Sequence, residues 1–229
     1  RELVLDEAAG RGPVVLLGHS IGGMIALTFA RLYPGELGGR VAGLVLVHTT
    51  HTNPVRTTQG SSVLAPLQTP VLEPLAYLMI GLSPLVWVMN VLSYVNGSMH
   101  WSNYRSLFSW TGTWGQLEWA TRYALQLWPA TYARGMLGMF GYHATDALRA
   151  IPVPTLVVAA DRDKLTKPSA SEEIAAAVPR AELVTLSPAG HFGLASSHEE
   201  FGRAVGGFLD RTLASPPAGA PAAAGVGVG

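Results

Sequence analysis

The sequence predicts an α/β protein in which about four parallel strands form a sheet flanked by helices, with a helical cap inserted between them. Short runs rich in Val, Leu and Ala alternate with segments of helical periodicity. One such run leads directly through a glycine-rich turn into a helix, and the middle of the chain is helical and rich in aromatic residues. The predicted strands cover residues 14–18, 41–47, 155–160 and 182–186.

The first predicted strand ends in the turn GHSIGG, residues 18–23, and a helical pattern over 24–33 follows and stops at Pro34. A G-x-S-x-G sequence between a strand and a helix is typical of a nucleophile elbow, which presents its serine at the strand end. Because Gly18 and Gly22 lack the β-carbons that would collide in a sharp turn, both are expected to permit it. Ser20 is therefore the predicted nucleophile.

A serine nucleophile needs a histidine to take its proton and a carboxylate to orient that histidine. The predicted strand 155–160 runs into the acidic turn DRD, where Asp161 or Asp163 is placed to provide the carboxylate. The last predicted strand, 182–186, is followed by a loop that ends in His191. His191 is the predicted base.

Three segments resemble the α/β-hydrolase superfamily: the elbow GHSIGG, the acid turn TLVVAADRD and the histidine loop SPAGHFG. The order serine, aspartate, histidine is also that of the family. The resemblance implies that Ser20, Asp163 and His191 hydrolyse a carboxylic ester or thioester, with the N–H of Ile21 as one oxyanion donor. It favours Asp163 because family members use the last carboxylate of this turn, and Asp161 is expected to cap the loop.

Neither a metal nor an organic cofactor is required for this chemistry, and no His, Asp and Glu cluster in the sequence has metal-site spacing. Perhydrolysis and hydrolysis of carbon–carbon bonds use the same triad, so both remain open. The competing hypothesis is a truncated or inactive hydrolase remnant that binds an apolar ligand or a partner chain.

Composition divides the chain into four parts, because all six tryptophans and six of the seven tyrosines fall in one stretch. Residues 1–50 are the elbow half of the core, 51–150 the helical cap, 151–213 the acid and histidine half, and 214–229 a disordered tail of Pro, Ala and Gly. The cap is expected to lie over the strand ends, with aromatic and methionine side chains lining an apolar pocket above Ser20.

The expected substrate is a small apolar ester. His19 is expected to point away from the nucleophile by strand alternation and to support the site rather than react. His48 and His51, after the second strand, are interpreted as ordinary loop residues. The side chains expected to border the substrate are His19, Trp87, Met89, Trp110 and Phe192.

No charged residue lies between Pro74 and Tyr104, and the apolar stretch 75–95 is about long enough to cross a membrane. Gly81 and Pro84 interrupt it, so two cap helices that break near Ser83 are predicted instead. The same residues would suit contact with a membrane interface or with a long acyl chain.

Residues 1–8 resemble the end of a helix that precedes the elbow strand. Family members carry further strands upstream, and a His-Gly loop among them provides the second oxyanion donor. The chain is therefore expected to be a fragment of a longer hydrolase, and these 229 residues on their own are expected to have severely weakened activity. Its elbow strand would form an open apolar edge, available for self-association.

The overall charge excludes some partners, since the formal net charge is zero and gives no electrostatic basis for binding nucleic acid. The sequence contains no cysteine, so it has neither disulfides nor a cysteine nucleophile. This composition favours a cytoplasmic setting.

Overall fold

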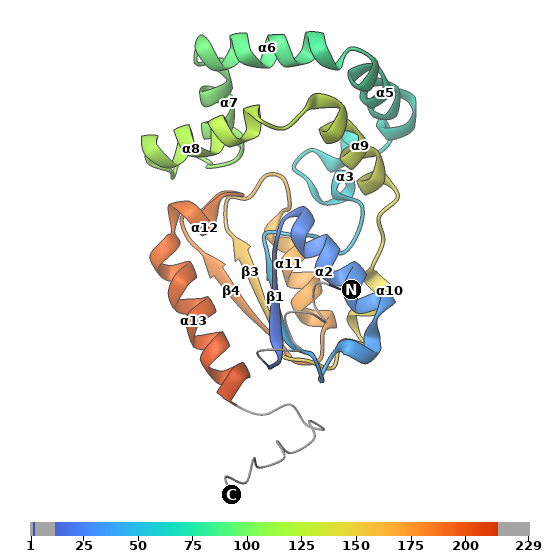
Figure 1. Cartoon of the computed structure of the whole chain (residues 1–229), viewed down its shortest axis with the longest axis vertical. Coiled ribbons are helices and arrows are strands. Elements are labelled where there is room, and N and C mark those ends of the chain that lie inside the picture. The colour runs from blue at the N-terminus through green and yellow to red at the C-terminus, as the bar shows by residue number, and fades with distance from the viewer. Residues whose placement is uncertain (1, 3–11, 215–229) are drawn as a thin grey trace, which may run out of the picture.

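The computed structural model describes Glu2 and residues 12–214, which form a sheet with helices on both faces and a helical layer above it (Figure 1). The sheet has four parallel strands in the order β1-β2-β3-β4. The predicted fold class is confirmed, and each strand agrees with its predicted range to within one residue at either end. The strands are β1 (Val14–His19), β2 (Val41–Val47), β3 (Thr155–Ala160) and β4 (Ala181–Leu186).

The two central strands, β2 and β3, are buried along their whole length, as expected for parallel strands covered on both faces. Among the described residues β1 pairs only with β2 and forms one edge of the sheet, where Leu17 is 50% exposed. His19 is in register with Val47, and Val47 with Val158. The carboxyl ends of neighbouring strands therefore finish together beneath the cap.

Helices cover both faces of the sheet because alternate side chains of each strand point to opposite sides. Leu44 and Leu46 of β2 face α2 (Ile21–Leu32), α10 (Thr145–Leu148) and α11 (Pro168–Ala177). Val45 and Val47 face α13 (His198–Ala214), which contributes Phe208. Burial of each such side chain stabilises the fold by about 1.5–3 kcal/mol.

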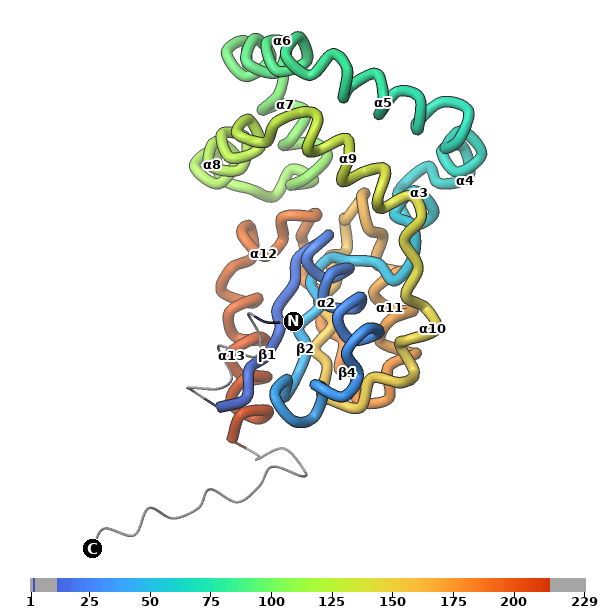
Figure 2. The backbone as a smooth tube through the Cα atoms, turned by 45° about the vertical axis from the view of Figure 1, so that its right-hand side comes forward, coloured from blue at the N-terminus to red at the C-terminus, as the bar shows by residue number. Residues whose placement is uncertain are grey.

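The cap forms a separate layer over the carboxyl ends of the strands (Figures 1 and 2). In both views α5 and α6 lie outermost, and α8 and α9 lie between them and the sheet. The cap helices are α3 (Pro54–Thr57), α4 (Ser61–Leu64), α5 (Glu73–Gly81), α6 (Ser83–Val95), α7 (Ser98–Ser106), α8 (Trp114–Leu125) and α9 (Pro129–Phe140), with a π-helical turn over Gln68–Leu72.

Helices α5 and α6 meet at a bend of 93°, so the predicted break near Ser83 is present. Pro84 stands in the first turn of α6, where its missing N–H leaves no helical hydrogen bond unmade. Within residues 12–214 no single helix is long and apolar enough to cross a membrane, although this bent pair reaches that threshold together by length and composition. Membrane-interface contact through 75–95 stays a prediction.

The end of the predicted cap packs with the sheet rather than with the cap helices. Ala144 and Leu148 lie in the same buried cluster as Leu27 of α2 and Leu44 of β2. By packing, the cap therefore ends before Ala144 and not at residue 150. The predictions for residues 1–8 and 215–229 fall outside the described residues, apart from Glu2, and helix α13 includes Ala214.

Leu148→Ala should lower the free energy of unfolding by about 2–5 kcal/mol, because it leaves a cavity in the sheet core. Leu32→Ala is the matched control, because Leu32 at the end of α2 is 58% exposed. This substitution should change the free energy of unfolding by less than about 0.5 kcal/mol. Urea unfolding followed by tryptophan fluorescence and circular dichroism measures both. Equal effects would place Leu148 outside the core.

Candidate active site

The elbow turns within a single residue, since β1 ends at His19 and α2 begins at Ile21. Ser20 between them has φ 55° and ψ −119°, a conformation that costs a non-glycine residue about 1–3 kcal/mol. Four hydrogen bonds to its backbone hold it there. The Ser20 N–H donates to Val47 O at 2.9 Å. Ser20 O accepts from Gly23 N at 2.9 Å, from Met24 N at 3.3 Å and from Thr49 Oγ1 at 2.7 Å.

The glycines of the elbow have different roles. A β-carbon on Gly18 would lie 2.3 Å from the carbonyl carbon of Gly22, and one on Gly23 would lie 2.6 Å from the side chain of Thr49. A β-carbon on Gly22 would meet no described atom within 4 Å. The expectation for Gly18 therefore agrees with the structure, whereas that for Gly22 is wrong. Gly22 contributes the backbone that Gly18 approaches.

The structure brings the three predicted catalytic side chains together in one hydrogen-bonded chain. His191 Nε2 lies 2.9 Å from Ser20 Oγ, and His191 Nδ1 lies 2.8 Å from Asp163 Oδ2. Asp163 also accepts from the N–H groups of Leu165 and Thr166, at 2.8 and 3.0 Å, and from Thr166 Oγ1 at 2.9 Å. These bonds fix the carboxylate that faces the histidine.

The electrostatics of this chain favour an ionised Asp163. Burial by itself raises the pKa of this carboxyl, but the hydrogen bond and charge attraction of His191 and the N–H groups of Thr166 and Leu165 hold it below its usual value. An ionised carboxylate accepts a hydrogen bond from His191 Nδ1–H, which leaves the lone pair of Nε2 directed at Ser20. The arrangement can therefore draw a proton from the serine hydroxyl.

Asp161 has no hydrogen bond to His191; it supports the loop that carries this histidine. Its Oδ1 accepts from the N–H of Ala189 at 2.8 Å, and its Oδ2 accepts from Ser187 Oγ at 2.7 Å. It therefore caps a loop, as expected, although the loop is the one after β4 and not its own turn.

A segment of the cap contacts both loops of the triad. The N–H of Phe192 donates to Leu107 O at 3.0 Å, and Ser109 Oγ donates to Arg162 O at 2.7 Å. Phe108 is fully buried, and its ring stacks on that of Phe192 with centroids 5.4 Å apart. The cap is therefore fixed to the acid turn and to the histidine loop, and Phe192 is the residue of the histidine loop that contacts it.

The other residues expected to border the substrate are dispersed. Trp110 is half exposed in the loop after α7 and contacts the Tyr104 ring edge-on. Trp87 and Met89 belong to α6, in the outer layer of the cap (Figures 1 and 2). Trp87 packs near Trp128, with centroids 6.4 Å apart, and Met89 is 59% exposed. Their placement does not support a pocket lined by α6 above Ser20.

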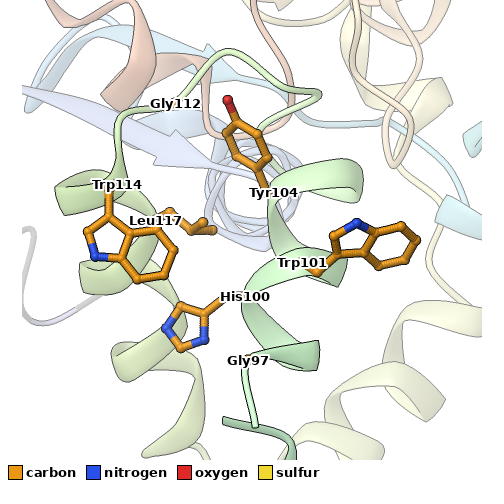
Figure 3. Close-up of a pocket in the computed structure, with 7 residues that line it drawn as sticks. All are labelled: Gly97, His100, Trp101, Tyr104, Gly112, Trp114 and Leu117. Atoms are coloured by element: carbon orange, nitrogen blue, oxygen red, sulfur yellow. The ribbon is translucent and has the colours of Figure 1, made fainter. Parts of the chain in front are cut away.

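The cap contains a cavity of about 440 Å³ between α7 and α8, and Ser20 is not among its lining residues (Figure 3). The His100 ring stacks on that of Trp114 with centroids 5.3 Å apart, and its Nε2 lies 2.6 Å from Glu118. This cavity is lined by Gly97, His100, Trp101, Tyr104, Gly112, Trp114 and Leu117.

Two further histidines contact His191, and the sequence pattern does not predict this contact for His48. His19 Nε2 and His48 Nδ1 each lie 2.9 Å from the carbonyl oxygen of His191. His19 thus supports the site, as expected, whereas His48 is not an ordinary loop residue. The signal that could have found His48 is its position directly after a strand that pairs with the elbow strand. His51 instead bonds Thr145 and Glu173.

The side chains within residues 12–214 include no group of three or more His, Asp and Glu residues placed to hold a metal ion.

A family model described as "Alpha/beta hydrolase family" matches residues 1–204. The chain belongs to the alpha/beta hydrolase family. Its fold, and the positions of Ser20, Asp163 and His191 at the ends of β1, β3 and β4, agree with this membership.

Several known proteins are similar to this alpha/beta hydrolase. Polyketide synthase ThaQ of Burkholderia thailandensis is 37% identical over 81 residues, which are 35% of this chain and 4% of ThaQ. A malate-bound thermophilic esterase from Thermogutta terrifontis has 23% identity and a TM-score of 0.69, over 91% of this chain and 69% of that one. The enol-lactonase from Burkholderia xenovorans LB400 has 19% identity and a TM-score of 0.58, over 90% and 68%.

Gly18→Ala should lower the free energy of unfolding by about 3 kcal/mol or more, because the added methyl group collides with backbone that cannot move aside. Gly22→Ala is the matched control and should be neutral or stabilise helix α2 by up to about 1 kcal/mol. Chemical denaturation compares the two variants with the wild type. Similar losses in both would contradict the assigned roles.

Proposed function

We propose that this protein is a serine hydrolase that cleaves a carboxylic ester or thioester of a small apolar molecule through an acyl-enzyme. The observation that carries the proposal is the hydrogen-bonded chain from Ser20 Oγ through His191 to Asp163, with distances of 2.9 and 2.8 Å. Esterases and a lactonase among the similar structures are consistent with this chemistry.

In the first half-reaction, Ser20 Oγ attacks the carbonyl carbon while His191 Nε2 takes the hydroxyl proton. Asp163 stabilises the resulting imidazolium through Nδ1–H and does not itself accept the proton. The tetrahedral intermediate collapses when His191 returns this proton to the leaving oxygen or sulfur. Water then attacks the acyl-enzyme by the same route, with His191 as base.

The N-terminus of α2 would stabilise the negative oxygen of the intermediate. Ile21 is the first residue of this helix, and the first N–H groups of a helix have no acceptor within it. They also lie at the positive end of the helix dipole. The Ile21 N–H is therefore the proposed oxyanion donor, a contribution of about 2.7–4 kcal/mol where such donors have been removed.

A fluorophosphonate probe tests the triad, because it phosphonylates only an activated serine. The wild type should gain one adduct by intact mass, Ser20→Ala none, and Asp163→Asn should react about 10⁴-fold more slowly because its histidine loses the correct tautomer. Asp161→Asn is the matched control and should retain most of the rate, because the asparagine oxygen can still accept the Ala189 N–H and so keep the histidine loop in place. An unlabelled but folded wild-type sample would favour a remnant that only binds.

Nitrophenyl esters of increasing acyl length test the apolar substrate. Each additional methylene that the enzyme buries should raise kcat/KM, at about 0.8 kcal/mol of transition-state binding or roughly fourfold per group, until the site is filled. Steady-state rates for acetate to decanoate esters measure this series. A preference for acetate alone would contradict an apolar acyl site.

A further inference from the structure

The main-chain carbonyl of His191 has two imidazole partners. His19 Nε2 and His48 Nδ1 both lie 2.9 Å from this oxygen, although they are 172 and 143 residues away in the chain. We infer that His19 and His48 are a pair of positioning residues that hold the His191 peptide by two N–H···O bonds and thereby set the direction of its ring. The inference rests on the proposed function, since it assigns these residues to the same site.

The fold places both donors at fixed points of the sheet. His19 is the last residue of β1, and His48 follows the last residue of β2, the strand that pairs with β1. The His48 N–H donates to Val158 O of β3 at 2.9 Å, and its backbone has φ 43°. His48 therefore leaves the strand in a left-handed conformation while its backbone remains attached to the sheet. The histidine loop is thus held by the rigid core.

The chemistry of the acceptor assigns the proton on each ring. A carbonyl oxygen can only accept, and it has two lone pairs, so both contacting nitrogens must carry a hydrogen. Neutral His19 is therefore the Nε2–H tautomer and neutral His48 the Nδ1–H tautomer. The opposite tautomer of either ring would bring a nitrogen lone pair to 2.9 Å from the carbonyl lone pairs.

The second nitrogen of His48 agrees with this assignment. Its Nε2 is buried and has no hydrogen-bond partner among the described residues. In the assigned tautomer this nitrogen carries no proton, so the only N–H of the ring is used on the carbonyl. The other tautomer would leave both a buried donor without an acceptor and a repulsive contact at Nδ1.

Both rings are in surroundings that keep them neutral when His191 becomes charged. Burial and, after it, the charge of His191 lower the pKa of His19 to about 3 and that of His48 to about 4. Asp163 is the nearby carboxylate and opposes these shifts. Ring centroids of His19 and His191 are 4.9 Å apart, so a second positive charge there would oppose the imidazolium formed in catalysis.

The loop around His191 is confined on its other side by the cap. A β-carbon on Gly193 would lie 2.9 Å from His48 Cε1, and one on Gly190 would lie 2.6 Å from Leu107 O. The loop therefore passes closely between His48 and the cap segment that holds Phe192. Without the two histidine donors, the His191 carbonyl would lose its hydrogen bonds on the sheet side, and the His191 ring could shift. A displacement of about 1 Å at a reacting group costs on the order of 100-fold in rate.

Amide side chains provide a position-specific rescue experiment. The amide nitrogen of asparagine can replace Nδ1 of a histidine, and that of glutamine can replace Nε2. His48→Leu and His19→Leu should each reduce the fluorophosphonate labelling rate and kcat by about 10- to 100-fold, with little change in KM. His48→Asn and His19→Gln should restore most of the loss.

The exchanged variants, His48→Gln and His19→Asn, are the matched controls, because they offer the same amide at the wrong distance. Their labelling rate and kcat should stay as low as those of the leucine variants. Equal rates in Asn and Gln variants at each position, or leucine variants as fast as the wild type, would overturn the positioning role. Thermal unfolding of every variant separates misfolding from displacement.

Nitrogen NMR of histidine-labelled wild-type protein tests the inference without turnover. Two-bond proton–nitrogen spectra should show His48 as the Nδ1–H tautomer and His19 as Nε2–H between pH 5.5 and 9, with neither ring titrating there. A His48 Nε2–H signal, or a titration of either ring near pH 6.5, would overturn the inference. If the spectra agree but fluorophosphonate does not react, the proposed hydrolase function fails and the positioning pair remains.

Discussion

The site depends on the close approach of Gly18 to the carbonyl of Gly22, where the chain leaves β1 and enters α2 with a single residue between them. A side chain at Gly18 would push the strand and the helix apart, and Ser20 between them would be displaced from the end of the strand. The strained backbone of Ser20 persists because Val47, Gly23 and Thr49 all bond to it. The backbone of Ser20 is therefore held at the end of β1.

The parallel sheet then brings the remaining groups to this serine. Strands in register end at one edge, so the loops after β1, β3 and β4 meet although they are far apart in sequence. Each loop is held by more than one contact: Asp161 supports the loop after β4, Thr166 supports Asp163, and His19 and His48 contact the peptide of His191. The proposed proton transfer from Ser20 to His191 would need such support, because its rate would depend on how closely the reacting groups are positioned.

The cap has an inner part that contacts the site and an outer part that does not. The loop with Phe108 and Ser109 bonds and packs against the acid turn and the histidine loop. Helices α5 and α6 lie outermost and expose Leu75, Leu78, Leu85 and Leu92 by half or more. The loop with Phe108 and Ser109 therefore contacts the turn of Asp163 and the loop of His191, whereas α5 and α6 form the outer layer.

The sequence by itself determined the α/β class, the four strands and the three catalytic candidates, because hydrophobic periodicity and the glycine-rich elbow are local patterns. The residues alone left Asp161 and Asp163 open, and the family resemblance favoured Asp163. The tertiary structure decided which carboxylate meets His191, since the two lie in one turn and reach different partners only when that turn packs against the loop after β4. It also decided that His48 contacts the base while Trp87 and Met89 lie in the outer cap layer. Side chains brought together from distant strands leave no periodic trace in a sequence, because their contact depends on register and on how the cap lies over the sheet.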